Sequence, residues 1–540
     1  MPLPRPATPR AGGRRRAEPA SAPAPRRPRR GGTLAAAPSR DLKRPADAAR
    51  KPAHPPTAIA SVSAAPLPAA LAGLVAELGP AGAHTDPADI ARYLTDHRRL
   101  YVGRTALVAR PATVGEVARV LRQCALAGIG VVPHGGNTSY CGGAVPDESG
   151  NQVVLSLERL ARIRAVDPAG GTLIAEAGCT LAAVHAAAQA HGRRFPLSLG
   201  SEGTCQVGGN LSTNAGGTSV LRYGMMRDLV LGLEVVLPDG QVLDQLRVLR
   251  KDNTGYDVKQ LFLGAEGTLG VITACALKVF PQPADYATAI VALEDIAAAV
   301  ALLGRVRDAF GDLVEGFEYL PGVAVRLALE HVPGATSPLA ASEPALALVE
   351  LAMPAAIGDL GERFSSFLQA EAEAGRIRDA AVAQSGLQRD TFWFLREHVP
   401  EAQTRAGASI KHDVSLPVAR LSEFVTRSTA LLDRIAPGAR IIGYGHVGDG
   451  NLHYNLSPPA GVTKGSAEEA AFLGLKDTVT RAIHDLVAEL GGSFSAEHGV
   501  GRLKVAELER YEDPVALALM RRIKAAIDPA GTMNPGKVLR

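Results

Sequence analysis

The stretch PHGGNTSYCGG (133–143) follows the strand-like run IGVVP and decides how the first half of the chain is interpreted. It is one of three glycine-rich segments, with 200–217 and GAEGTLGVIT (264–273) as the others. Glycine lets a backbone turn with positive φ and approach a ligand closely, and successive exposed N–H groups in such loops form anion-binding nests. One such loop usually only turns the chain. Two of them at one end of two α/β units are suited to hold a pyrophosphate between them.

Alternating strand and helix patterns surround these loops. The expected elements are a strand at 105–110, a helix from the capping box Thr113-Val-Gly-Glu116 to Gly128, strands at 153–157 and 173–177, a helix from Thr180 to Gly192, and a hairpin with a Pro-Asp-Gly turn at 230–243. From 284 onward, strand-like runs such as ATAIVAL (287–293) alternate with the Ala-rich helical runs 295–309 and 356–375. That alternation favours an α+β domain with an antiparallel sheet.

Two common nucleotide-binding motifs are excluded. None of the glycine-rich segments continues into GK[ST], so none is a Walker loop. A formal GxGxxG occurs at 443–448, but the dinucleotide fingerprint needs a helix after it. The residues that follow are Asp-Gly-Asn and the strand-like LHYNL.

The charge is concentrated at the start of the chain. The 540 residues carry a formal charge of +4, yet residues 1–57 alone carry +11 and the remainder −7. With thirteen prolines, that segment buries too little apolar surface to offset its ordering entropy, so an Arg/Pro/Ala-rich disordered tail is predicted over 1–57. A transit peptide and an extension without function both fit it. A nucleic-acid arm is disfavoured because no aromatic residue is interleaved to stack on bases, and no nucleic-acid partner is expected.

The cysteines and the hydropathy pattern indicate a cellular compartment. The five cysteines are scattered and form no CxxC pair, which favours buried thiols in a reducing environment. No run of eighteen apolar residues lacks a charge or a helix breaker, so we expect no integral membrane segment. No apolar core of an export signal is present. The expectation is a cytoplasmic protein, or a mitochondrial one if its source is eukaryotic.

Several long motifs in order carry a family resemblance. PHGGNTSYCGG (133–143), SLGSEGTCQVGGNLSTNAGG (198–217), DNTGYDVKQLFLGAEGTLGVIT (252–273) and GTMNPGKV (531–538) resemble the FAD-binding domain of the vanillyl-alcohol-oxidase/PCMH flavoprotein family. GYGHVGDGNLHYN (443–455) and SAEHGVGRLK (495–504) are similar to its D-2-hydroxyacid branch.

The resemblance implies an α+β fold in two parts. A PCMH-type FAD-binding domain of two α/β subdomains is expected over 60–283, with its core at 102–283, and the segment 505–540 completes it. A substrate (cap) domain with an antiparallel sheet, flanking helices and a metal site is expected over 284–504.

The resemblance also implies the residues that bind FAD. Those of the loops, the third glycine-rich segment and the C-terminal tail are His134, Gly135, Gly136, Asn137, Thr138, Ser139, Gly200, Ser201, Thr204, Gly208, Gly209, Asn210, Ser212, Glu266, Gly267, Gly270, Ile272 and Asn534. Relatives that bind flavin covalently often have a histidine at the position of Asn137. The asparagine therefore favours non-covalent FAD.

A further group of candidate functional residues consists of His446, His453, Glu497 and His498. Two histidines and a carboxylate are a divalent-metal set that leans to zinc, and the Gly-Asp-Gly turn permits a hairpin that brings His446 and His453 together. Glu497 and His498 are adjacent, so in an extended chain they point to opposite sides. The resemblance implies that His446, His453 and Glu497 bind the metal and that His498 is the catalytic base and a substrate contact.

The substrate contacts implied by the resemblance are Arg396, Lys411 and Asn455, besides His498. An arginine suits a planar carboxylate because it binds both oxygens, although a solvated surface charge is the plainer interpretation of Arg396 and Lys411. The branch that binds a second carboxylate is expected to have a hydroxyl residue where this chain has Pro400.

The implied function is an FAD-dependent dehydrogenase that oxidises a D-2-hydroxyacid, of the 2-hydroxyglutarate or lactate type, to the 2-oxoacid. The metal would polarise the 2-hydroxyl, His498 would take its proton, and flavin N5 would accept the hydride. A glycolate or D-lactate oxidase using another acceptor and a flavin-free metal-binding module are the alternatives. An electron-transfer flavoprotein or a quinone fits as electron acceptor, and a homodimer is compatible with the sequence.

Overall fold

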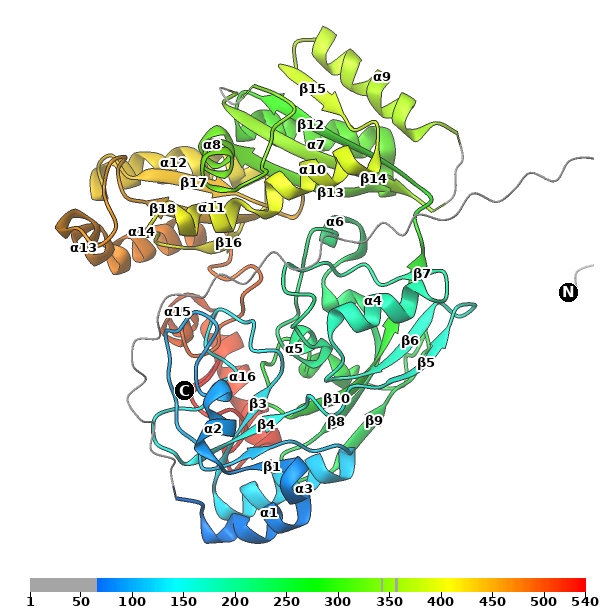
Figure 1. The fold of residues 1–540 in the computed structure, drawn as a ribbon, viewed down its shortest axis with the longest axis vertical. Coiled ribbons are helices and arrows are strands. Elements are labelled where there is room, and N and C mark those ends of the chain that lie inside the picture. The colour runs from blue at the N-terminus through cyan, green and yellow to red at the C-terminus, as the bar shows by residue number, and fades with distance from the viewer. Residues whose placement is uncertain (1–65, 341–342, 355–357) are drawn as a thin grey trace, which may run out of the picture. The chain divides into compact units, whose positions relative to one another are not determined.

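The structure, a computed structural model, describes residues 66–340, 343–354 and 358–540 (Figure 1). All of these residues belong to one compact unit, Ser61–Arg540. The basic tail predicted over 1–57 lies outside the described residues.

The first sheet joins the beginning of the described chain to its C-terminal end. Its strands are β1 (Ala83–His84), β2 (Val108–Ala109), β4 (Gln152–Ser156) and β3 (Gly130–His134), in that spatial order. β2, β4 and β3 are parallel, and β1 is antiparallel to β2. The helices α1 (Ala69–Gly82) and α3 (Val114–Ala127) bury their apolar faces on this sheet, and α2 (Pro87–Ile90) is a short turn. At the β3 edge, Val131 exchanges backbone hydrogen bonds of 2.8 Å with Thr532 and Asn534, so the C-terminal segment extends the sheet.

The second sheet is antiparallel throughout. Its strands, in spatial order, are β5 (Ile163–Asp167), β6 (Thr172–Glu176), β10 (Val271–Lys278), β8 (Val230–Val236) and β9 (Val242–Gln245). The helices α4 (Leu181–Gln189) and α5 (Val207–Ser212) pack against it, α6 (Val220–Tyr223) follows, and β7 (Arg193–Arg194) pairs with β11 (Phe280–Pro281). All five cysteines of the chain are buried and unpaired, as the sequence predicts.

The third sheet explains why the run ATAIVAL is apolar without interruption. The strands are β13 (Val314–Pro321), β14 (Ala345–Met353), β12 (Asp285–Leu293) and β15 (Asp379–Val382), all antiparallel. Ala289 and Val291 of β12 face the core under α7 (Ile296–Phe310) and α9 (Leu360–Glu373). Ile290 and Ala292 face the core under α8 (Gly322–His331), α10 (Gly386–Glu397) and α11 (Val399–Arg405). Because helices cover both faces, both alternating sets of side chains are buried.

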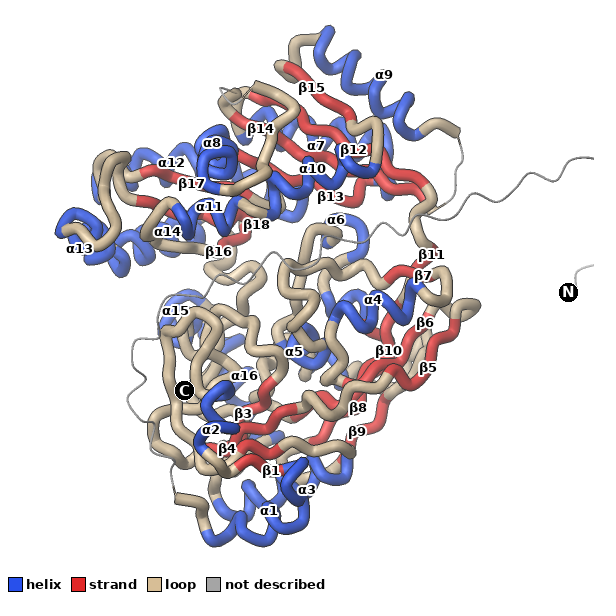
Figure 2. Tube along the Cα trace, viewed as in Figure 1, coloured by secondary structure: helices blue, strands red, loops and turns tan. Residues whose placement is uncertain are grey.

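The fourth sheet lies beside the third (Figure 2), and it contains Asp413 and His453. Its strands are β16 (Asp413–Ser415), β18 (Asn451–Ser457) and β17 (Arg440–Tyr444). The helix α12 (Leu421–Ile435), between β16 and β17, and the helices α13 (Ala467–Gly474) and α14 (Lys476–Glu489), after β18, contribute to the core of this half of the chain. Tyr319 of β13 and Gly445 exchange backbone hydrogen bonds of 2.8 and 3.0 Å, which join the two sheets. The last helices are α15 (Val505–Tyr511), whose Glu507 lies 3.0 Å from His484 of α14, and α16 (Pro514–Ile527), whose Ile523 and Ile527 pack on the core of the second sheet.

The locally encoded elements confirm the sequence predictions. Thr113 caps α3 by accepting a hydrogen bond of 3.2 Å from the N–H of Glu116, and Gly128 ends the helix at a φ of 64°. The Pro-Asp-Gly turn joins β8 to β9 as an antiparallel hairpin. Over the described ranges, no helix has the length and apolar character needed to cross a membrane.

Candidate active site

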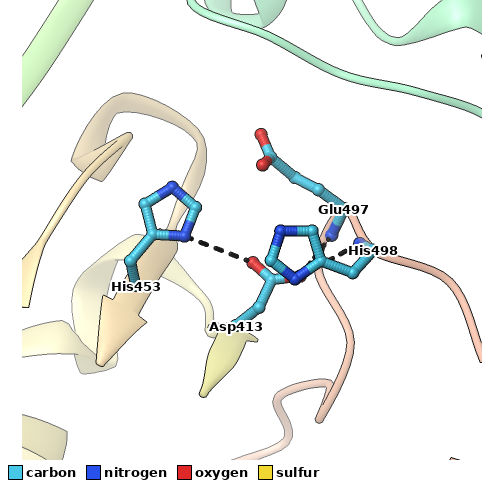
Figure 3. A group of neighbouring side chains, drawn as sticks. All are labelled: Asp413, His453, Glu497 and His498. Atoms are coloured by element: carbon cyan, nitrogen blue, oxygen red, sulfur yellow. Dashed lines mark hydrogen bonds and ion pairs between the residues drawn. The ribbon is translucent and has the colours of Figure 1, made fainter. Parts of the chain in front are cut away.

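Asp413 lies at the centre of a cluster of histidines and carboxylates (Figure 3). Strand pairing places it directly opposite His453, and the His453 Nδ1 atom lies 3.7 Å from Asp413 Oδ1. One ligand atom from each of Asp413, His453, Glu497 and His498 falls within 4.8 Å of the others. No sequence pattern marks Asp413, although it lies two residues after Lys411 in the stretch SIKHDVSLP (409–417).

The expectation that Glu497 and His498 point to opposite sides is wrong, because both belong to this one cluster. The segment around them is not extended. The backbone N–H groups of Glu497 and His498 both donate to Asp413 Oδ2, at 2.9 and 3.0 Å, and His498 Nδ1 lies 3.2 Å from the same oxygen. The chain therefore wraps around the Asp413 carboxylate and directs two successive side chains toward one place.

His446 approaches the cluster from the turn between β17 and β18. Its Nε2 lies 3.4 Å from Glu497 Oε1, and its ring centroid lies 5.6 Å from that of His453. Its Nδ1 faces Glu318 Oε1 of β13 at 2.6 Å, so the other ring nitrogen is the one directed at Glu497. Gly450 makes this turn possible, because its φ is +87° and a Cβ there would lie 2.1 Å from Leu416 O. No local sequence pattern marks Glu318, so the sequence does not predict its role.

The protonation states follow from burial and neighbouring charges. Burial lowers the pKa of His453 to about 3 and that of His498 to about 4, so both rings are neutral at physiological pH. Burial acts the same way on His446, but the Glu318 and Glu497 carboxylates outweigh it and raise its pKa to about 9. Burial raises the pKa of Glu497 to about 7. A neutral imidazole is the form that binds a metal ion or accepts a proton.

The residues predicted to bind the substrate differ in the protein groups that they already contact. Arg396, on α10, is buried, and its Nε donates to Glu318 Oε2 at 2.7 Å. Lys411 has no ion pair or hydrogen bond within the described residues. Asn455 is buried, with its Nδ2 donating to Gln403 at 3.0 Å and its Oδ1 accepting from the N–H of His412 at 3.2 Å, so both ends of its amide are engaged by the protein.

The first two glycine-rich loops are packed against each other, as a shared ligand site needs. A Cβ on Gly136 would lie 2.1 Å from Thr204 O, and one on Gly135 would lie 3.6 Å from the Cα of Gly209. The remaining predicted positions lie at the end of β3, in the same two loops, in α5, in the segment leading into β10 and in β10 itself: His134, Asn137, Thr138, Ser139, Gly200, Ser201, Gly208, Asn210, Ser212, Gly267, Gly270 and Ile272. Asn137 has a φ of 53°, and its Nδ2 donates to Thr95 O at 2.8 Å.

Glu266 and Asn534 connect the parts of the site. The Glu266 carboxylate accepts hydrogen bonds from the N–H groups of Val500 (2.7 Å) and Gly501 (2.8 Å), directly after His498. Asn534 Nδ2 donates to Glu266 O at 2.8 Å and to Gly143 O at 3.0 Å. Asn534 Oδ1, Gln206 Oε1 and Lys537 Nζ are buried and have no hydrogen-bond partner among the described residues. Such orphaned polar atoms are expected where a bound group is to be received.

Comparison with known proteins identifies the family. The "FAD binding domain" family profile matches residues 105–245, and that of "FAD linked oxidases, C-terminal domain" matches 282–538. The chain is 38% identical over 445 residues to "D-2-hydroxyglutarate dehydrogenase, mitochondrial" of Arabidopsis thaliana, covering 82% of this chain and 77% of the relative. It is 34% identical over 456 residues to "D-2-hydroxyglutarate dehydrogenase" of Xanthomonas citri pv. viticola, covering 84% and 93%.

A solved structure supports the fold. p-Cresol methylhydroxylase with substrate bound superposes with a TM-score of 0.68 at 17% identity, over 87% of this chain and 96% of the other. This likeness confirms the PCMH-type α+β fold expected from the glycine-rich motifs. With the two profiles and the similarity to the dehydrogenases, it shows that the chain belongs to the FAD-linked oxidase family that includes the D-2-hydroxyglutarate dehydrogenases.

Proposed function

We propose that this protein is an FAD-dependent dehydrogenase that oxidises a D-2-hydroxyacid to the 2-oxoacid. The observation that carries the proposal is the cluster of neutral histidines and carboxylates, which contacts a loop of the FAD-binding motif. The ring of Tyr140, in the loop 134–143, lies 4.7 Å from the ring of His498 and nearly perpendicular to it. Relatives named as D-2-hydroxyglutarate dehydrogenases support the same substrate class.

The residues fit non-covalent FAD. The two packed glycine loops offer backbone N–H groups for a pyrophosphate, and the buried Asn534 Oδ1 and Gln206 Oε1 remain free to bind the cofactor. When bound, FAD supplies the acceptor for the two electrons removed from the substrate. Asn137 offers no nucleophile for a covalent link. Acid precipitation should therefore release all of the yellow colour, and a pellet that keeps its flavin would contradict this assignment.

The donor set also fits a divalent metal. His446, His453 and Glu497 are the proposed ligands, and metal binding would displace the proton that the carboxylates of Glu318 and Glu497 keep on His446. Asp413 is already occupied by two backbone N–H groups and by Asn451 Nδ2 at 3.0 Å. Glu318 behind His446 and Asp413 behind His453 would fix the ring orientations, as carboxylates behind ligating histidines do. Two imidazoles and a carboxylate favour zinc. A bound metal would act as a Lewis acid at the 2-hydroxyl.

His498 is the proposed general base. Its neutral ring accepts a proton from the substrate hydroxyl, and Asp413, 3.2 Å from Nδ1, holds the tautomer that leaves Nε2 free to do so. Arg396 would bind the C1 carboxylate with its terminal nitrogens, since its Nε is held by Glu318. Lys411 is the second proposed cationic contact.

The decisive experiment is a panel of D- and L-2-hydroxyacids assayed with an artificial electron acceptor. We expect turnover with a D-acid only, no turnover after chelation with FAD still bound, and recovery on addition of Zn²⁺. Turnover of the L-acids alone, or a colourless protein, would contradict the proposal. An electron-transfer flavoprotein or quinone as acceptor, a homodimer and a cytoplasmic location remain predictions.

A further inference from the structure

Arg98 is a cation beside the candidate active site, and no sequence pattern marks this residue. It lies in the loop 95–101, before β2, and its guanidinium carbon is 5.9 Å from the centroid of the Tyr140 ring. Tyr140 in turn contacts the ring of His498, with centroids 4.7 Å apart. One aromatic ring therefore separates Arg98 from the proposed base.

The loop that carries Arg98 is held in place by a buried carboxylate. Asp96 accepts hydrogen bonds from the backbone N–H of Arg98 at 3.0 Å and from that of Tyr101 at 2.6 Å. Thr95 and Val102 close the loop through an isolated bridge, and the ring of His97 lies 5.5 Å from that of Tyr140. The backbone position of Arg98 is thus fixed, which is what a specific contact requires.

Arg98 and Lys411 are two like charges without a counter-charge. Within the described part of the chain, no carboxylate forms an ion pair with either of them, although Arg396 has Glu318. Burial lowers the pKa of Lys411, and the charge of Arg98 lowers it further, so the two cations lie within electrostatic reach of each other. Lys411 lies two residues before Asp413, whose Oδ2 is 3.2 Å from Nδ1 of the proposed base His498.

The cations flank the cluster on different sides. Arg396 contacts Glu318, which in turn contacts His446, whereas Arg98 lies near the Tyr140 ring, which contacts His498. A substrate with one carboxylate satisfies only one of these positions. A 2-hydroxyacid with a second carboxylate satisfies both.

We propose that Arg98, with Lys411, binds the second carboxylate of a dicarboxylic D-2-hydroxyacid and so determines specificity for it. The inference rests on the proposed function and extends it to a residue of the flavin-side loop 95–101. Because Arg98 is exposed, the contact is screened by salt, and its contribution falls as ionic strength rises.

The test compares Arg98→Gln with Arg98→Lys and with the control Arg99→Gln. Arg99 is an exposed arginine of the same loop. The assays measure kcat and KM for D-2-hydroxyglutarate and for D-lactate, flavin content, and the Kd of 2-oxoglutarate and pyruvate from flavin difference spectra. We expect Arg98→Gln to raise the KM of D-2-hydroxyglutarate and the Kd of 2-oxoglutarate about tenfold, with kcat and the constants for D-lactate within about twofold. Arg98→Lys should recover part of the loss, and Arg99→Gln should match the wild type.

The two proposals fail in different ways. A wild-type protein that oxidises neither acid contradicts the proposed function before any variant is examined. A wild-type protein that prefers D-lactate, a variant equal to wild type, or a variant that weakens both substrates alike overturns the role of Arg98. D-lactate turnover and flavin content show whether Arg98→Gln is folded, so a misfolded variant is recognised, and Arg98→Lys then carries the same comparison.

Discussion

At the residue scale, the roles of His453 and His498 are separable although their rings are neighbours, with centroids 6.1 Å apart. His453→Ala removes a proposed ligand, so the purified variant should contain little metal and behave like the chelated enzyme. His498→Ala should keep its metal and lose kcat by roughly 10²–10⁴, the usual range for a general base. Metal analysis beside steady-state kinetics checks both. A metal-free His498→Ala would make His498 a ligand, as its place in the compact four-residue cluster allows.

Lys537 provides a pH-dependent prediction away from that cluster. The residue is 3% exposed, its ammonium has no hydrogen-bond partner in the described part of the chain, and burial lowers its pKa to about 8 from 10.5. The unfolded chain therefore keeps this proton between pH 8 and 10.5 while the folded protein releases it, so stability rises with pH in that window. Below pH 8, Lys537→Met should be more stable than wild type by up to about 3 kcal/mol in flavin-depleted protein. Urea unfolding at several pH values should show this difference vanish near pH 10.5, and a constant difference would contradict the assignment.

At the scale of elements, Glu266 fastens the turn before β10 to the turn after His498. Glu266→Ala would leave the N–H groups of Val500 and Gly501 without their acceptor, at a cost of roughly 1–3 kcal/mol for each buried group. We expect a lower unfolding midpoint and faster hydrogen exchange at 497–501, measured by mass spectrometry. Thr268→Ala serves as a control, because its hydroxyl bonds only within the same turn, to Ala265 O at 2.7 Å. Exchange unchanged at 497–501 would show that Glu266 does not hold this turn.

The sequence predicts the elements that a few adjacent residues determine, but not the contacts between residues that are far apart in the chain. The cap of α3 and the hairpin β8–β9 follow from a few adjacent residues, and both are confirmed. Asp413 meets Glu497 and His498 across more than eighty residues, and Glu318 meets His446 across 128. No local period marks such partners, because a buried carboxylate on a strand looks like any interruption of an apolar run. The opposite orientation expected for Glu497 and His498 assumed an extended chain. The hydrogen bonds from their N–H groups to Asp413 prevent that conformation, and no local pattern marks Asp413 as their partner.

At the scale of the whole molecule, Glu315 is a buried polar contact between the sheets that carry the glycine loops and those that carry the histidines. From β13 it pairs with Arg194 at 2.5 Å and Arg222 at 3.4 Å. Breaking a buried ion pair leaves an uncompensated charge and costs about 3–5 kcal/mol, whereas an exposed pair contributes about 0–1 kcal/mol.

Glu315→Ala should therefore lower the unfolding midpoint strongly, because two arginines lose their carboxylate at the junction on which the approach of His498 to the flavin loops depends. Glu294→Ala is the matched control, since its pair with Arg378 is exposed, with 70% and 50% of the two side chains accessible. Its midpoint should stay near that of the wild type. Glu315→Gln keeps the shape and one acceptor oxygen, so it should fall between the two. Thermal unfolding with parallel kcat measurements tests the series, and equal midpoints for Glu315→Ala and Glu294→Ala would mean that the junction is held by its apolar contacts alone.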